Sequence, residues 1–186
     1  TVNSPWRDIK VYNNHAFIVS EAPGHGLQVF DLSKLRSIET EQIFEADFHF
    51  KSFGNAHNIA INKESGFAYV LGSKLFDGGP AFIDINSPIN PTIEGGYSFS
   101  SYTHDAQVVK YNGPDNRFKG KEILFGSNSV GGENNQIIIL DVTDKKNPEL
   151  ISSTEYSNSG YTHQRWLSDD HKYFFLNTQQ NLSVCL

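Results

Sequence analysis

The chain has 186 residues, of which 38% are hydrophobic and 13% aromatic, so it is expected to be globular rather than disordered. Its formal net charge is −6 at pH 7, and no cluster of Lys and Arg is dense enough for phosphate binding, which argues against nucleic acid as the main partner. No apolar run reaches the length of a membrane span, and the single cysteine, Cys185, excludes an internal disulfide framework.

The first fifty residues are typical of short strands separated by turns. Strands are predicted over residues 10–12 and 15–20, joined at Asn13-Asn14, because Asn tolerates the positive φ of a tight turn. A third strand is expected over residues 27–32 and a fourth within residues 38–48.

The same order of strands and turns follows in the rest of the chain. Strands are predicted over residues 59–61, 67–72, 81–85 and 92–99, and then over residues 106–111, 122–126, 137–142 and 150–156. The loop over residues 112–120 is longer than its counterparts and is expected to be a surface insertion. A last set begins at His163 and continues over residues 172–177, and nothing after Gln179 resembles its third and fourth strands.

Four segments, at residues 6–12, 56–62, 103–109 and 162–167, begin alike. Arg7, His57, His104 and His163 fall at equivalent places, with spacings of 50, 47 and 59 residues. Such a period in strand-like sequence predicts an all-β fold, a β-propeller of four-stranded antiparallel blades. The predicted blades are 6–50, 55–100, 103–157 and 161–178, the last incomplete, within one partial propeller domain over 1–186. About three and a half blades cannot close a ring, so a further chain or a second copy is expected to complete it.

Acidic residues recur at the ends of the third strands. Asp31, Asp84 and Asp141 are interpreted as turn residues whose carboxylates cap backbone N–H groups. Glu21 and Asp31, like Asp169 and Asp170, are interpreted as ordinary turn and strand-end acids, so a pair of glycosidase carboxylates is not predicted.

Several stretches together carry a resemblance to a known family. They are residues 6–10, 57–62 with 66–69, 102–107, 111–115, 141–145 with 147–148, and 161–164. The chain resembles the repeat domain of the choice-of-anchor B proteins, which carry LVIVD-type propeller repeats, over about residues 6–178. The resemblance implies a β-propeller with an extracellular or cell-surface location, and it implies no activity. The chain departs from the family at residues 177–180, where the family tends to be acidic.

Three histidines are the candidates for chemistry. His57, His104 and His163 open the first strands of successive blades, which line the channel in a propeller, so their imidazoles are expected to face a common axis. Three His with an open position can bind a divalent metal such as Zn or Cu, and Asp105 is a candidate fourth ligand or ring-orienting group. In the alternative interpretation, these repeated polar residues hydrogen-bond the backbone of a neighbouring blade and are structural.

The favoured function is a secreted or cell-surface module that binds a protein or small-molecule ligand at the channel mouth. Arg7 can pair with an anionic ligand, and Asp8, Asn58, Gln164 and Arg165 are the other candidate ligand-binding residues. A metal-dependent enzyme that uses the histidines and a subunit of a larger assembly, homo-oligomeric or completed by another chain, remain as alternatives. No catalytic residue is assigned.

Overall fold

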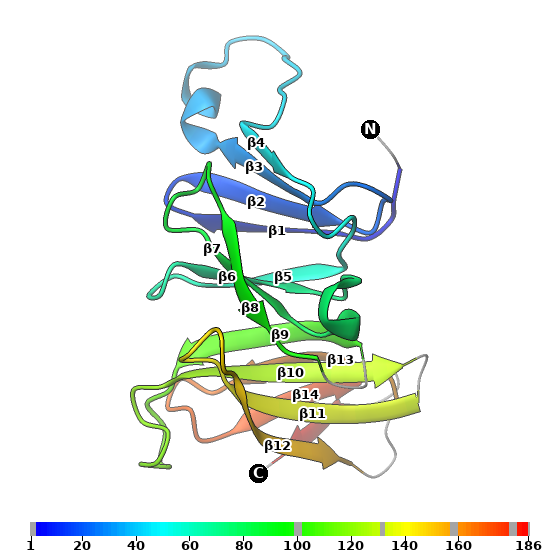
Figure 1. Cartoon of the computed structure of the whole chain (residues 1–186), viewed down its shortest axis with the longest axis vertical. Coiled ribbons are helices and arrows are strands. Elements are labelled where there is room, and N and C mark those ends of the chain that lie inside the picture. Colours follow the sequence, from blue (N-terminus) through cyan, green and yellow to red (C-terminus); the bar gives the residue numbers. More distant parts are fainter. Residues whose placement is uncertain (1–2, 99–101, 131–132, 157–159, 179–181, 186) are drawn as a thin grey trace.

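A computed structural model of the protein describes residues 3–98, 102–130, 133–156, 160–178 and 182–185. The described residues form four antiparallel sheets, which confirms the all-β class expected from the sequence. Within each sheet the strands are neighbours in the order in which they occur along the chain. The sheets therefore form from consecutive segments, and the first three follow one another down the molecule in Figure 1.

The strands have the following bounds. The first sheet contains β1 (Arg7–Tyr12), β2 (His15–Ser20), β3 (Leu27–Asp31) and β4 (Phe48–Phe50). The second contains β5 (Asn58–Asn62), β6 (Phe67–Leu71), β7 (Ala81–Asp84) and β8 (Thr92–Gly96). The third contains β9 (Thr103–Lys110), β10 (Glu122–Val130), β11 (Glu133–Asp141) and β12 (Glu149–Glu155), and the fourth β13 (Thr162–Leu167), β14 (Phe174–Thr178) and β15 (Leu182–Cys185).

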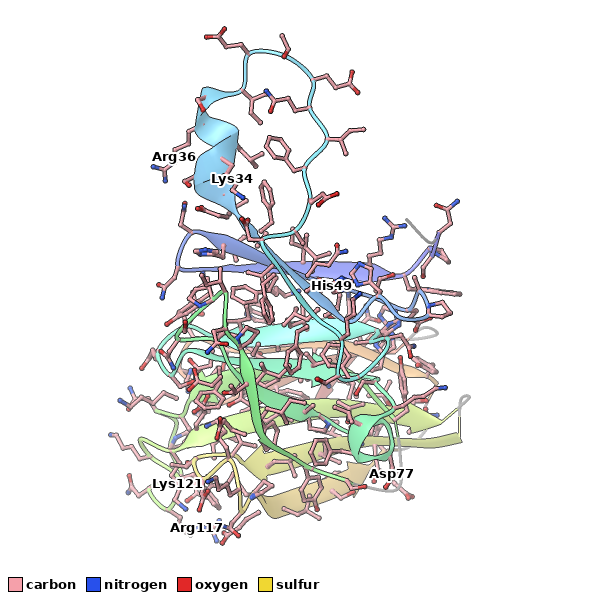
Figure 2. The ribbon with its side chains drawn as sticks, turned by 45° about the horizontal axis from the view of Figure 1, so that its top comes forward. Lys34, Arg36, His49, Asp77, Arg117 and Lys121 are labelled. Carbon is pink, nitrogen blue, oxygen red and sulfur yellow. The ribbon has the colours of Figure 1, made fainter. Side chains whose placement is uncertain are left out.

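The structure differs from the predicted strands at two places. The fourth strand of the first sheet is Phe48–Phe50, because residues 38–47 leave the sheet after the 3-10 helix η1 (Leu32–Ser37) and carry mostly exposed side chains. Figure 2 shows this excursion extending beyond Lys34 and Arg36. The fourth sheet has a third strand, Leu182–Cys185, which pairs antiparallel with β14. This strand is only four residues long and was not predicted from the sequence.

The predicted turn at Asn13-Asn14 is confirmed by its backbone angles. Asn13 and Asn14, between β1 and β2, have φ values of 44° and 59°, the positive range that a tight hairpin needs.

The second 3-10 helix, η2 (Leu75–Gly78), lies between β6 and β7. Across the described residues, neither of these helices is long and apolar enough to cross a membrane.

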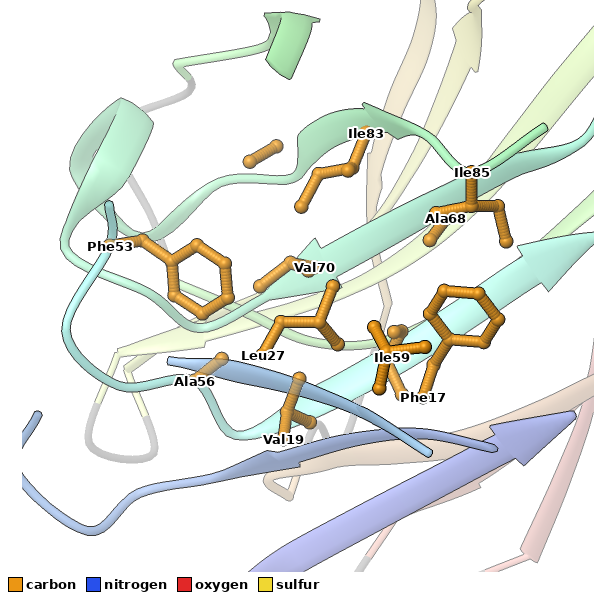
Figure 3. Packing of buried hydrophobic residues seen from close by; sticks show 12 residues of the cluster. Phe17, Val19, Leu27, Phe53, Ala56, Ile59, Ala68, Val70, Ile83 and Ile85 are labelled. Carbon is orange, nitrogen blue, oxygen red and sulfur yellow. The ribbon is translucent and has the colours of Figure 1, made fainter. Parts of the chain in front are cut away.

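Apolar side chains fill the space between consecutive sheets. Residues on β6 alternate between two clusters: Ala68 and Val70 pack toward the first sheet, whereas Tyr69 and Leu71 pack toward the third. A strand covered on both faces is expected to be apolar at every position, as this one is. Figure 3 shows the first of these clusters, between the first two sheets.

The third core is smaller and joins the third sheet to the fourth. Ile123 and Phe125 of β10 meet Leu167 of β13, with Phe174 packed at the edge. Leu124, between the two β10 residues, belongs instead to the second core. The period of two along β10 therefore places one face of the third sheet against the second sheet and the other face against the fourth.

The strand-end acids are caps, as predicted. Asp31 Oδ1 accepts from the Ser33 backbone N–H at 2.8 Å, and Asp84 Oδ1 accepts from that of Asn86 at 2.8 Å. Asp141 Oδ1 accepts from the Thr143 N–H at 3.0 Å. The same two-residue step in three sheets is the Asx turn that ends each third strand.

We expect Asp84→Ala to lower the free energy of unfolding by about 1 kcal/mol, because the variant loses the hydrogen bond to the Asn86 N–H. Urea denaturation at pH 7 measures the change. The control is Glu41→Ala, at an exposed position of the 38–47 excursion, which should leave the urea midpoint unchanged. Equal midpoints for the two variants would contradict the capping role.

Candidate functional site

The three predicted histidines come together in the structure, and we call His57, His104 and His163 the histidine row. The ring centroids of His57 and His104 are 4.3 Å apart, and those of His104 and His163 are 4.5 Å apart. His57 lies directly before β5, and the other two are second residues of β9 and β13. Because β5, β9 and β13 contact one another in that order, equivalent positions of three sheets meet.

Hydrogen bonds define which ring nitrogen carries the proton in His57 and in His104. His57 Nδ1 lies 2.5 Å from Glu21 Oε1, and a carboxylate can only accept, so Nδ1 donates. His104 Nδ1 lies 3.2 Å from the His163 backbone carbonyl and donates to it for the same reason. In neutral His104 the other nitrogen, Nε2, is therefore left as an acceptor. The contact with the His163 carbonyl is the hydrogen bond to a neighbouring sheet that the structural interpretation predicted.

The central ring of the row is held neutral. Burial, the largest cause, acts together with the nearby charges of His57, His163 and Arg165 to lower the pKa of His104 from 6.5 to about 4. Only the hydrogen bond to the His163 carbonyl opposes this shift. At pH 7 the row therefore presents an uncharged imidazole at its centre.

A cavity of about 320 Å³ borders the histidine row. Its walls are the three histidines, two tyrosines, one tryptophan and one carboxylate: Trp6, Glu21, His57, Tyr102, His104, Tyr161 and His163. The Tyr161 ring meets His104 edge to face, with centroids 5.2 Å apart and planes at 90°. Burial raises the pKa of Tyr102 and of Tyr161, and the charge of Glu21 raises both further. Both hydroxyls are therefore protonated at neutral pH.

Four of these wall residues were missed from the sequence. Tyr102 and Tyr161 each stand two residues before a histidine of the row, and the repeated Tyr-Thr-His triplet was the signal for them. Trp6 directly precedes Arg7, the equivalent position of the first repeat. Glu21 had no such signal, and its interpretation as an ordinary turn acid was wrong, because it binds the His57 ring.

A second cavity, of about 240 Å³, also borders the histidine row. Arg7, Asp8, Asn58 and Gln164, all predicted ligand-binding residues, line it. Arg7 is exposed at the start of β1. Asp8 has a structural contact as well, because its Oδ2 accepts from the Ile59 backbone N–H at 3.2 Å and so links the first sheet to the second.

The first strands of all four sheets line a third and larger space of about 530 Å³, which we call the inner cavity. Asp8 of β1, Asn58 of β5, Asp105 of β9, and Gln164 and Arg165 of β13 are among its walls. The predicted ligand-binding residues other than Arg7 therefore share this cavity, although they are far apart in sequence. Their convergence follows from the contacts of β1 with β5, β5 with β9 and β9 with β13.

Contrary to the prediction, the Asp105 side chain does not lie beside the histidine rings. It follows His104 in β9, so its side chain projects from the other face of the strand. Its Oδ1 accepts from Asn58 Nδ2 at 3.1 Å and from the Ala106 backbone N–H at 2.8 Å. Asp105 therefore belongs to the inner cavity, and a role in orienting a histidine ring is not supported.

The geometry of the row does not match a metal centre. Neighbouring rings contact each other with interplanar angles of 46° and 40°. Within the described ranges, no group of three or more His, Cys, Asp or Glu side chains is arranged to hold a metal ion. A Zn or Cu ion at His57, His104 and His163 stays a prediction.

The arrangement can bind polar groups. It offers an imidazole acceptor at His104, hydroxyl donors at Tyr102 and Tyr161, and the carboxylate of Glu21 in one cavity. No protein-family model matches the chain, and no curated protein matches it.

Proposed function

We propose that the chain is part of a β-propeller of the choice-of-anchor B type, located outside the cell or at its surface, and that it acts as a binding module. The support for the propeller is the stacking of consecutive antiparallel sheets through their apolar faces. The contacts between β1, β5, β9 and β13 support it further, because innermost strands of neighbouring blades meet in this way. The location rests on the family resemblance alone.

The ligand site is the cavity beside the histidine row. The observation that carries this proposal is that rings from three separate sheets meet in one row whose sides border open cavities. Hydrogen bonds between sheets would account for His104, but they do not require Glu21, Tyr102 and Tyr161 to surround an open space of about 320 Å³. A concave site with a few convergent polar groups is the usual form of a small-molecule site.

A ligand-observed NMR screen tests the proposal. Fragments that carry hydrogen-bonding groups are screened against the wild-type chain, His163→Ala, and His15→Ala as the control on β2, outside the cavity. At least one fragment should bind the wild type and the control alike and should bind His163→Ala at least tenfold more weakly, the loss expected for one or two hydrogen bonds. Fragments that bind all three proteins equally would contradict a ligand site at the row.

A further inference from the structure

The charges around the larger cavity beside the histidine row favour a cation. Among the described residues that line it, Glu21 is the one carboxylate, and none is Lys or Arg. Arg7 borders the smaller cavity of about 240 Å³ instead. His104, at the centre of the row, is uncharged at neutral pH, because its pKa is lowered to about 4, mainly by burial. The cavity of about 320 Å³ is therefore suited to a positively charged ligand.

The Glu21 carboxylate is held at the wall of this cavity and remains accessible. Its Oε1 accepts from His57 Nδ1 at 2.5 Å, which fixes the position of the carboxylate. Burial, and after it the charge of Glu21, raises the pKa of Tyr102 and of Tyr161, so the carboxylate lies near both tyrosines. The Glu21 side chain is 29% exposed, and a ligand in the cavity can therefore meet its charge.

Aromatic rings form much of the remaining wall. The Tyr102 and Tyr161 rings both approach His104, with centroids 6.4 and 5.2 Å from that of its imidazole. Both tyrosines are partly exposed, and Trp6, which also lines the cavity, is 56% exposed. Several Trp and Tyr rings around one space attract a quaternary ammonium ion through cation–π interactions.

A glycine positions one of these rings. A Cβ atom at Gly72 would lie 2.5 Å from the Tyr102 hydroxyl oxygen, so any side chain at this position would displace Tyr102. Gly72 also has a φ of 63°, a value that residues with a Cβ rarely adopt. The close approach restricts the Tyr102 ring, so this wall is formed before a ligand arrives and the cost of ordering it on binding is small.

We propose that this cavity binds a small organic cation with a quaternary ammonium group. Such a group has no N–H to satisfy, so it does not need the acceptors that a primary ammonium requires. Glu21, whose Oε1 already accepts from His57, would supply the opposite charge. The rings of Tyr102, Tyr161 and Trp6 would contact the methyl groups of the ligand. This inference rests on the proposed binding function and names the ligand class.

Ligand-observed NMR on the whole chain tests the inference with choline and its neutral isostere, the alcohol in which a tert-butyl group replaces the trimethylammonium group. The two molecules share a shape and a hydroxyl and differ in charge, so the wild type should bind choline at least tenfold more tightly. Glu21→Gln keeps an oxygen for the His57 hydrogen bond but removes the charge, and it should weaken choline binding by about threefold or more. Glu41→Gln, the matched change at an exposed position, should bind choline like the wild type.

Tyr161→Phe and Tyr161→Leu form a second pair of variants. The Phe variant keeps the ring and should retain choline binding, whereas the Leu variant removes the π face and should weaken it by about fivefold or more. Equal wild-type binding of choline and the alcohol, wild-type choline affinity in Glu21→Gln, or equal choline affinity in the two Tyr161 variants would overturn the inference. The two proposals fail separately: a neutral fragment that loses affinity in His163→Ala, while choline does not bind, would leave the ligand site in place and refute the cation.

Discussion

Replacing Glu122 with alanine is expected to lower the free energy of unfolding by about 3–5 kcal/mol at pH 7, the loss typical of breaking a buried charged pair. Glu122 begins β10, and its Oε1 accepts from Asn62 Nδ2, Ser65 Oγ and the Tyr69 hydroxyl of the second sheet at 2.7, 2.7 and 2.6 Å. Its Oε2 accepts from Lys145 Nζ at 2.9 Å. One carboxylate therefore joins the second sheet to the third, and its removal leaves several buried donors without an acceptor.

Urea denaturation of three variants separates this network from ordinary surface charge. Glu122→Gln keeps an acceptor oxygen but loses the charge that faces Lys145, so its free energy of unfolding should lie between those of the wild type and Glu122→Ala. Arg117→Ala breaks an exposed ion pair with Asp115 and should leave the midpoint nearly unchanged. A urea midpoint of Glu122→Ala as close to the wild-type value as that of Arg117→Ala would contradict the stabilising role of the Glu122 network.

The pH dependence of this network has a definite sign. Burial by itself raises the pKa of Glu122, but the hydrogen bonds from Tyr69, Lys145 and Ser65 and the charge of Lys145 outweigh burial and hold the pKa below its ordinary value of 4.5. A carboxyl with a lowered pKa stabilises the fold above its unfolded pKa, and the contribution is lost as the pH falls through the folded pKa. Glu122 should therefore support stability at neutral pH, and this contribution should be lost as the pH falls through a folded pKa that lies below 4.5.

The repeat was enough to predict the class of fold and the meeting of the histidines. Strand alternation and turn residues such as Asn13 and Asn14 determine local structure, and a regular period forces equivalent residues onto equivalent strands. The convergence of His57, His104 and His163 followed from their equivalence alone.

What the repeat could not predict are the contacts without a periodic counterpart. Glu21 reaches His57 across a sheet boundary, and Glu122 reaches three residues of the second sheet, yet neither belongs to a repeated motif. Asp105 was placed by proximity in sequence to His104, although successive residues of a strand face opposite sides. Such contacts depend on side-chain geometry between sheets, which a single sequence does not encode as a spacing.

Acid is expected to destabilise the protein through His104. Its pKa is about 4 in the fold, whereas an unfolded histidine has a pKa of about 6.5. Between these values the unfolded chain binds a proton that the folded chain does not, so stability falls as the pH is lowered from 6.5 to 4. At roughly 1.4 kcal/mol per pKa unit, the complete loss is about 3 kcal/mol. Above pH 6.5 and below pH 4, His104 adds no pH dependence.

Unfolding free energies measured across pH 4–7 for the wild type and His104→Asn test this link, because the difference between the two curves removes the contribution of every other titrating group. His104→Asn should lose stability less steeply toward acid than the wild type. Thr103→Val is the matched control: it changes a buried, uncharged neighbour on β9 whose hydroxyl donates to Asn128, so it should lower stability by a constant amount and keep the wild-type slope. If His104→Asn instead kept that slope, His104 would have to titrate alike in the folded and unfolded chains, and the neutral imidazole at the centre of the proposed ligand site would be lost with it.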